Sequence, residues 1–521
     1  MPEVKGYDVI VVGAGNAALC AALSAHEGGS RVLVLEKAPL EERGGNSLFT
    51  AGGFRFVHNG IEDLRKDVLT DLSEAEVDQI VLPSLSKQQY LDDLMRVTED
   101  ESDDQLADML IGRSRETMVW MRSHGVRFIP MFNRQSYKVG GKHHFYGGVN
   151  VEAVGGGHGL VESLIRRAEK LGIEIRYGTE MRELLEDQKG TVIGVRVKGP
   201  EGYEDIAGSA IVLACGGFEA NPEMRTRYLG PGWELCRVRG TRHNTGGGIR
   251  AALDIGAQPF GGWSTCHAVQ WDISAPPFGD RVVLDNFQKH SYPIGIVVNL
   301  KGERFIDEGA DYRNHTYAKY GREVMKQPRR TAVQIFDAKT IDMVRDEYRI
   351  KQVTKFTANT LEELAAGLDI DPKGLVRTVT AFNAACRPGT YNPSILDGVR
   401  TEDIEPPKSN WALPIDKPPF TGFVVTCGIT FTFGGLRIDR TTAVLDTAGQ
   451  RMPGLFAAGE LVGGIFYGNY LGGAGLMSGS VFGRQAGKSA SDHALRAGFK
   501  GDRFATPEEL RREDAPERGL L

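Results

Sequence analysis

The chain has 521 residues, of which 25% are charged, and its formal net charge is −6. This length is too great for a small binding module and fits a multi-domain enzyme. The mildly acidic balance provides no attraction to nucleic acid, so we expect no nucleic-acid partner. Glycine contributes 66 residues without a three-residue period, which indicates many tight turns rather than a collagen-like repeat.

The six cysteines are scattered and include no C-x-x-C pair, so we expect no metal site and no iron–sulfur or haem centre. The longest aliphatic runs are of strand length, far below the roughly 18 residues of a membrane span. The N-terminus lacks the pattern of a secretion signal. We therefore expect a cytoplasmic protein without a transmembrane segment, whose redox cofactor is organic.

The first chemical signal is a glycine-rich turn after a β-branched run. Residues 8–12 predict a buried parallel strand, and the chain then turns into an Ala-rich helix. Glycine at such a turn lets a pyrophosphate approach the helix N-terminus, where free amides and the helix dipole favour anions. A second strand, 31–35, ends at an acid that can accept from ribose hydroxyls. The unit predicts a dinucleotide site that contains Gly13, Gly15, Asn16, Ala17, Ala18, Glu36 and Lys37.

Later glycine-rich segments are expected to complete this site. Segments 43–47 and 51–53 follow directly, and their amides are suited to surround a phosphate or a flavin ring. Segment 454–460 predicts a short strand that ends in a turn and an acid. The run 472–479 opens a helix whose dipole would face the cofactor, although tight helix packing alone is an alternative explanation. These segments add Gly44, Gly45, Asn46, Ser47, Gly52, Gly53, Gly459, Glu460, Gly475 and Leu476.

Several motifs in order resemble the flavoprotein-subunit family of fumarate reductase and succinate dehydrogenase. They are VVGAGNAALCAAL, GGNS, LACGGFEAN, NTGGGIRAALDIGA, VVNLKGERFIDE, GLFAAGELVGG and GNYLGGAGLMSGSVFGRQAG. The resemblance spans nearly the whole chain and implies an FAD enzyme that moves hydride between a C–C bond and flavin N5. Within the family, residues 97–128 and the C-terminal run look most similar to tricarballylate dehydrogenase. The motifs add Ala214, Gly216, Gly217, Asn244 and Gly246 to the predicted cofactor site.

The resemblance implies an α/β fold, in which a discontinuous, Rossmann-like FAD-binding domain carries an inserted α+β capping domain. We expect the FAD-binding domain at 1–256 and 419–521 and the capping domain at 257–418. Pro-rich stretches near residues 405 and 417 support the end of the cap. Gly45 stands where some members carry a flavin-linked histidine, so we expect non-covalent FAD.

The resemblance also places the catalytic proton on an arginine shortly after the stretch at 299–308. Arg313 stands one residue from that place and is our first catalytic candidate, a surface ion pair being the alternative. Removing hydride and a proton from neighbouring carbons needs such a proton handler. Tyr470 and His267 are further candidates, since a phenol can hydrogen-bond a substrate oxygen and His267 lies near the family's substrate-binding histidine. A flavin-contact or core role is the alternative for Tyr470.

Three departures from the family pattern bear on the substrate. Phe431 and Tyr470 replace two residues that bind substrate carboxylates, and 291–295 lacks the arginine and glutamate of a proton relay. We therefore expect a dehydrogenase of a small, tricarballylate-like polycarboxylate, with the proton handled by Arg313. The alternatives are a 3-ketosteroid-dehydrogenase-like desaturase of a neutral ketone, a fumarate-reductase-like enoate reductase and a non-catalytic FAD carrier. The electron acceptor stays open among oxygen, a quinone and an iron–sulfur partner protein.

Overall fold

The computed structural model describes residues 6–496, and its first sheet has eight strands. Their order is β10-β11-β12-β1-β2-β9, with β20 paired to β12 and β19 paired to β20. The central strands are parallel and almost entirely buried, as expected for β-branched runs covered by helices. The strands of this sheet are β1 (Tyr7–Val12), β2 (Val32–Leu35), β9 (Glu174–Arg176), β10 (Glu180–Glu186), β11 (Val192–Gly199), β12 (Gly202–Leu213), β19 (Ala443–Leu445) and β20 (Arg451–Ala457).

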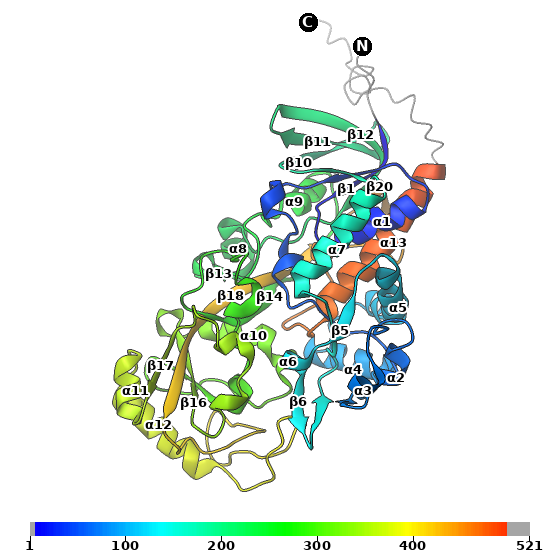
Figure 1. Cartoon of the computed structure of the whole chain (residues 1–521). Helices are drawn as coiled ribbons and strands as arrows, with labels where there is room; N and C mark the ends of the chain where they lie inside the picture. Colours follow the sequence, from blue (N-terminus) through cyan, green and yellow to red (C-terminus); the bar gives the residue numbers. More distant parts are fainter. Residues whose placement is uncertain (1–5, 497–521) are drawn as a thin grey trace, which may run out of the picture.

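Two helices from opposite ends of the chain pack together beside this sheet, α1 (Asn16–Glu27) and α13 (Ala474–Arg496) (Figure 1). Gly479, Gly483 and Gly487 repeat every four residues, which places them on one face of α13. A side chain at Gly483 or Gly487 would collide with backbone oxygens of α1. Glycine therefore permits a close helix pair, which brings the first and last segments of the chain together.

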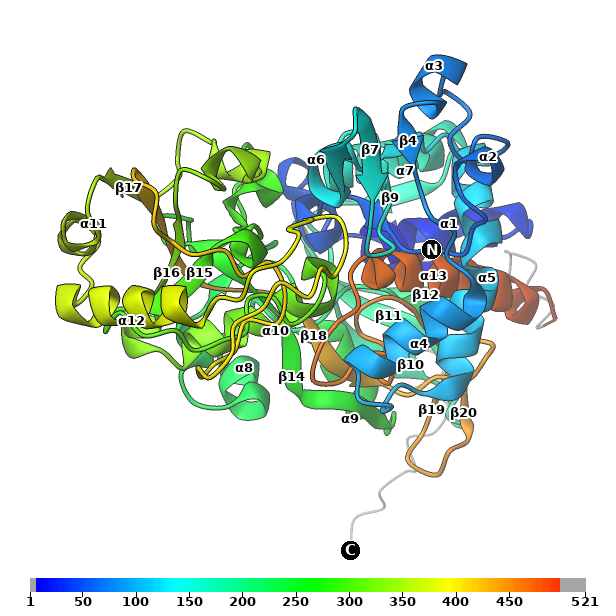
Figure 2. The ribbon, with the colours of Figure 1, turned by 90° about the horizontal axis from the view of Figure 1, so that it is seen from below.

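The second sheet forms a separate part of the molecule, at the left of Figure 2. Its long strand β18 pairs antiparallel with β14, β16 and β17, and α11 and α12 enclose a hydrophobic core against it. Helix α10 packs on β14 and β18. We call this sheet with α10, α11 and α12 the cap. Its elements are β13 (Arg237–Val238), β14 (Pro259–Asp272), β15 (Ile296–Asn299), β16 (Ala332–Phe336), β17 (Lys355–Ala358), β18 (Phe420–Leu436), α10 (Arg313–Met325), α11 (Leu361–Gly367) and α12 (Pro372–Ala385).

The predicted capping domain at 257–418 covers β14 through α12 of this part. Two strands outside those limits, β13 and β18, pair within the same sheet, and β18 reaches from the cap toward the first sheet (Figure 1). The predicted FAD segments, 1–256 and 419–521, hold the first sheet and its helices. Residues 1–5 and 497–521 of those segments lie outside the described residues. The domain limits themselves stay a prediction.

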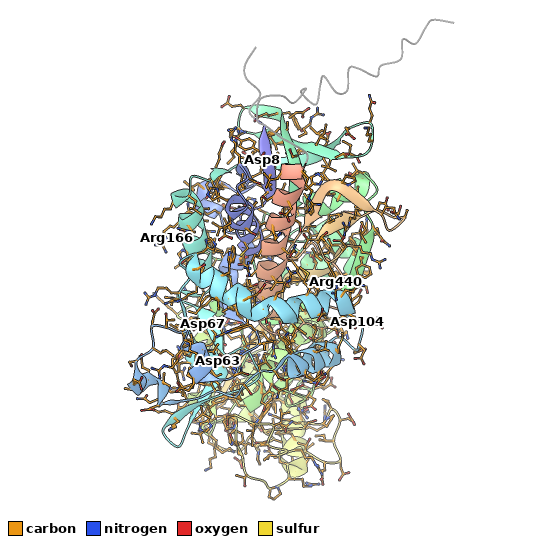
Figure 3. The ribbon with its side chains drawn as sticks, turned by 90° about the vertical axis from the view of Figure 1, so that its right-hand side faces the viewer. Asp8, Asp63, Asp67, Asp104, Arg166 and Arg440 are labelled. Carbon is orange, nitrogen blue, oxygen red and sulfur yellow. The ribbon has the colours of Figure 1, made fainter. Side chains whose placement is uncertain are left out.

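A helical insertion covers the side of the molecule that faces the viewer in Figure 3, where α5 crosses α13. Asp63 and Asp67 both pair with Arg115 of α5, and Arg440 pairs with Asp108 at 2.9 Å. The first two ion pairs hold the insertion's own helices together, and the third joins α5 to the loop before β19 of the first sheet. The remaining helices are α2 (Ile61–Leu64), α3 (Glu74–Val77), α4 (Lys87–Val97), α5 (Asp104–Ser123), α6 (Phe132–Gln135), α7 (Gly156–Lys170), α8 (Pro222–Leu229) and α9 (Gly247–Asp254).

Two small three-stranded sheets complete the structure. Their strands are β3 (Gly53–Phe54), β5 (Phe128–Pro130) and β8 (Val151–Ala153), and β4 (Ile80–Val81), β6 (Ser136–Val139) and β7 (Lys142–Phe145). Within residues 6–496, none of the helices combines the length and the hydropathy that crossing a membrane would take.

Candidate active site

One large cavity lies between the carboxyl ends of the parallel strands and the cap. It holds about 1660 Å³ of empty space, part of it open to solvent. The N-termini of α1 and α13 line one part, and residues of α10, β14 and β18 line the other. A crevice beyond the carboxyl ends of a parallel sheet is the usual place for a ligand in such folds.

The turn between β1 and α1 has the geometry that glycine alone allows. Gly13 has a φ of +109°, and a Cβ atom there would lie 2.5 Å from the backbone oxygen of Ala214. The backbone N–H of Asn16 donates to Ser47 Oγ at 3.0 Å, and its side chain donates to the Leu476 oxygen at 3.0 Å. Three segments predicted separately from the sequence are therefore joined at the N-terminus of α1.

Glu36 lies at the end of β2 and lines the cavity, as expected for an acid that faces a ribose. Its two carboxylate oxygens accept from the backbone N–H groups of Ala14, at 2.8 Å, and Ala38, at 2.7 Å. Burial raises the pKa of Glu36, although these two amides oppose that shift. Lys37 donates to Thr245 Oγ1 at 2.7 Å, which ties the same loop to the segment just before α9.

Most predicted cofactor residues line this cavity. They are Gly13, Gly15, Asn16, Ala17, Glu36, Lys37, Gly45, Asn46, Ser47, Gly53, Ala214, Gly216, Asn244, Gly459, Glu460, Gly475 and Leu476. The structure places five others behind the lining, at Ala18, Gly44, Gly52, Gly217 and Gly246. Ala18 is fully buried in α1, and the glycines shape turns instead, since a Cβ atom at Gly52 would lie 2.6 Å from the backbone of Gly156.

The shape and the donors of the cavity fit FAD. The first turn of α1 presents backbone N–H groups without intrahelical acceptors, which suit a pyrophosphate. Glycines at 13, 45 and 459 all adopt positive φ and keep the wall free of side chains. The lining continues from this turn to the aromatic residues of the cap, so one elongated ligand can reach both ends.

The three predicted catalytic residues, Arg313, His267 and Tyr470, line the cap end of the cavity together. The rings of His267 and Tyr470 stack, with their centroids 4.4 Å apart and their planes at 15°. The backbone N–H of Gly475 donates to the phenol oxygen of Tyr470 at 2.8 Å. Because that bond uses only the oxygen, the phenol proton is available to a substrate acceptor.

Arg313 is the first residue of α10 and faces the cavity without a carboxylate partner among residues 6–496. Its Nη2 donates to the backbone oxygen of Arg134 at 3.2 Å, and its Nε is buried without an acceptor. Removal from solvent and the nearby charge of Arg345 lower the pKa of Arg313. The structure therefore does not show the surface ion pair that was the alternative role for Arg313.

Two further arginines stand beside Arg313, and the sequence analysis did not identify them. Arg239 donates to Asp285 Oδ1 through Nε at 2.8 Å, and Arg134 pairs with the other oxygen of the same carboxylate. Arg134, Arg239 and Arg313 all line the cavity, while Asp285 lies behind them. Asp285 thus pairs with two of the three guanidinium groups, and Arg313 has no carboxylate partner among residues 6–496, which leaves an excess of positive charge. The motif at 244–257 begins just after Arg239 and so did not include it, and Arg134 lies far from every motif that carried the resemblance.

His267 is neutral in this setting. Burial, with a contribution from the charge of Arg239, lowers its pKa well below the usual value for histidine. Its Nε2 is buried without a hydrogen-bond partner among the described residues. Tyr317 lies edge-on to both His267 and His290, with ring centroids 4.8 and 5.0 Å away.

Tyr317 is a cavity residue that the sequence analysis missed. It lies one helical turn after Arg313 on α10, and the guanidinium carbon of Arg313 stands 5.4 Å from its ring centroid. The four-residue spacing from Arg313 was the signal that could have identified it, because such residues share a helix face. Burial raises the pKa of Tyr317 to about 12, so its phenol is protonated at neutral pH.

Phe431 gives this end of the cavity an apolar wall. Its ring packs 5.6 Å from Phe466 and 5.7 Å from Tyr470. Phe431, which stands where the resemblance implies a carboxylate-binding histidine, therefore adds a hydrophobic surface to the cavity that the arginines also line. Among residues 6–496, no three His, Cys, Asp or Glu side chains come together as a set that could hold a metal ion.

The chain is similar to known proteins over most of its length. Residues 8–476 match the family described as FAD binding domain. The probable fumarate reductase Ifc3 of Shewanella frigidimarina is 28% identical over 500 residues, covering 94% of this chain and 75% of that protein. The 3-oxosteroid 1-dehydrogenase of Mycobacterium tuberculosis is 26% identical over 575 residues, covering 94% and 99%. The open conformation of a flavocytochrome c3 fumarate reductase superimposes with a TM-score of 0.70 at 27% identity, covering 95% of this chain and 79% of that one.

These findings confirm the predicted flavoprotein fold and the FAD cofactor. The finer likeness to tricarballylate dehydrogenase and the non-covalent mode of binding stay predictions. The family match spans most of the chain and contains both the glycine turn of β1 and the N-terminus of α13. The chain therefore belongs to the FAD binding domain family, as an FAD-dependent oxidoreductase with the fold of the fumarate reductase flavoproteins.

Proposed function

We propose that the protein is a dehydrogenase that removes hydrogen across a C–C bond beside a carboxylate, in a polycarboxylate of the tricarballylate type. The observation that supports this most is the group of Arg134, Arg239 and Arg313 at the cap end of the cavity. Arg134 and Arg239 share one acidic partner, Asp285, and Arg313 has none among the described residues, so the site lacks negative charge. Guanidinium groups bind carboxylates through two parallel hydrogen bonds, and a ligand with several carboxylates would supply the missing charge.

In this proposal each cap residue has a defined task. FAD, when bound, supplies the hydride acceptor at flavin N5. Arg313 takes the proton from the carbon next to the one that loses hydride, which its lowered pKa favours. Tyr470 donates its phenol hydrogen to a substrate oxygen on which negative charge develops. His267, neutral and stacked on Tyr470, holds that phenol in place.

A second candidate function is the desaturation of a neutral ring ketone. The stack of His267 and Tyr470 with Phe431 provides an apolar wall and one phenol donor, which suit a ketone carried by a hydrophobic skeleton. The similarity to a protein named 3-oxosteroid 1-dehydrogenase also supports this second candidate. The arginine group argues against the ketone, because a neutral ligand would leave the positive charge of the arginines uncompensated. Reduction of an enoate is the third candidate, and the likeness to a protein named fumarate reductase supports it.

The experiment that tests the proposal is anaerobic mixing of the FAD-loaded protein with tricarballylate and, separately, with a 3-ketosteroid. The absorbance of oxidised flavin is followed in both. Bleaching by the tricarboxylate alone is expected. Bleaching by the ketone alone would overturn the proposal in favour of the second candidate. The bleached protein is then mixed with oxygen, a quinone or an iron–sulfur protein, and the one that reoxidises the flavin is the electron acceptor. The proposal includes all three classes of acceptor.

A further inference from the structure

Two carboxyl groups, those of Glu219 and Glu460, lie together beside the FAD cavity. Glu460 follows β20 and lines the cavity with an exposed fraction of 8%, and Glu219 lies behind it with an exposed fraction of 0%. Each carboxyl group lies close enough to act on the other, and burial together with the neighbouring Glu460 raises the pKa of Glu219. Neither forms an ion pair with a lysine or arginine within residues 6–496.

The other contacts of the pair come from neutral donors. Glu219 Oε1 accepts from Asn244 Nδ2 at 2.7 Å and from the side-chain amide of Asn46. Glu460 Oε1 accepts from the backbone N–H of Thr432 at 2.8 Å and from its hydroxyl at 3.1 Å. Glu219 Oε2 is buried without a donor. A hydrogen between two carboxyl groups would provide that missing donor.

The charged and titratable groups around the pair do not neutralise it. Arg225 on α8 directs its guanidinium to the backbone oxygens of residues 219 and 234 rather than to the carboxylates. The thiol of Cys266 on β14 carries no charge, because burial raises its pKa well above the usual value. Two ionised carboxylates in contact in such surroundings repel each other, and one of them is expected to keep its proton.

Gly217 shows that the chain makes room for this arrangement. A Cβ atom at that position would collide with Glu460 Oε1 and with the hydroxyl of Thr432. Gly217 was predicted as a cofactor residue, and it lies behind the cavity lining instead. Gly217 therefore leaves the space that the Glu460 carboxylate occupies.

We propose that Glu219 and Glu460 share one proton at neutral pH, and that the charge of this pair is coupled to the redox state of the bound flavin. The pair carries one negative charge while it holds the proton and two after the proton is lost to solvent. The second charge beside the cofactor disfavours the arrival of electrons, so it lowers the flavin midpoint potential. The inference depends on FAD binding and not on the identity of the substrate.

The first test is infrared spectroscopy of the FAD-loaded protein at neutral pH. The wild type is expected to show a carboxylic acid C=O band that is missing in Glu219→Gln. Glutamine keeps the shape of a protonated glutamic acid and donates to Glu460 permanently, so this variant should fold. Glu460→Gln is the second variant and should lose the same band. A spectrum that is unchanged by both substitutions would overturn the shared proton.

The second test is the flavin midpoint potential as a function of pH. The wild-type curve is expected to fall below that of Glu219→Gln at the pH where the carboxylic acid band disappears, because only the wild type gains a second charge. Glu180→Gln is the control, since Glu180 lines the same cavity but pairs with Lys37 at 2.9 Å and with Arg182 at 2.7 Å. Its curve should keep the wild-type shape. Curves of wild type and Glu219→Gln that stay parallel across that pH would overturn the coupling.

Discussion

His267 and Tyr470 stack ring on ring at 4.4 Å, although one lies on β14 of the cap and the other precedes α13 of the first sheet's helix pair. The contact joins the two parts of the molecule at the cavity. It fixes the phenol of Tyr470, whose oxygen already accepts from Gly475, so that its hydrogen is available to a ligand in the cavity. The consequence is a donor whose position depends on both parts of the molecule.

Tyr470→Phe removes this donor and keeps the ring stack. We expect the turnover number to fall about 10- to 100-fold, because one hydrogen bond to developing charge is lost. FAD content should stay close to that of the wild type. Steady-state kinetics with flavin absorbance as the measure of loading checks both. An unchanged turnover number in the FAD-loaded variant would exclude Tyr470 from the chemistry.

Arg313→Gln should reduce turnover by roughly 100-fold or more, since a proton handler is removed. FAD should still bind, because Arg313 lies at the cap end of the cavity. Arg440→Gln is the matched control, being an arginine on the surface that pairs with Asp108 (Figure 3). Equal activity of the two variants would contradict the assignment of Arg313.

Arg239→Gln tests the polycarboxylate proposal. We expect kcat/KM for a tricarboxylate to fall roughly 10- to 100-fold, the usual range for a lost hydrogen bond to a charged group. Asp285 keeps its pair with Arg134, so the fold should survive. The same substitution should leave kcat/KM for a neutral ketone unchanged or raised. A fall of equal size for both ligands would point to a structural role of Arg239.

Gly13→Ala should abolish FAD binding. Its φ of +109° costs an alanine about 1–3 kcal/mol, and the added methyl group meets the oxygen of Ala214. Gly29→Ala separates these causes, because Gly29 has a φ of +88° with open space around it. That control should lose some thermal stability and keep its flavin. Equilibrium dialysis of FAD and a melting curve for each variant are the measurements.

Acid should destabilise the protein through His267. The pKa of this side chain is lowered in the folded state, so below about pH 6.5 the unfolded chain binds a proton that the folded chain does not. The stabilisation that the neutral His267 contributes is therefore complete above about pH 6.5 and is lost progressively as the pH falls below that value. Melting temperatures between pH 5 and 7.5 should fall less steeply for His267→Gln than for the wild type. The same substitution at the exposed His158 should leave the pH dependence unchanged.

Much of the cofactor site could be predicted from the sequence, because its chemistry depends on the backbone. The turn at Gly13 needs a positive φ and brings its backbone close to that of Ala214. Only glycine meets both requirements, so the turn can be recognised from the sequence. The strand before it and the helix after it are local in sequence, so their order is visible without the fold. The same reasoning identified Gly459 and Gly475, which lie at the ends of a strand and at the start of a helix.

The charge at the cap end of the cavity was decided only by the tertiary structure. Arg134, Arg239 and Asp285 come from three separate segments, and no local pattern distinguishes them from surface residues. Glu219 and Glu460 likewise meet only because β12 and β20 pair in parallel. Backbone turns are specified by neighbouring residues, whereas the partners of a charged side chain depend on which distant segments the packed sheets bring within a few ångströms of it.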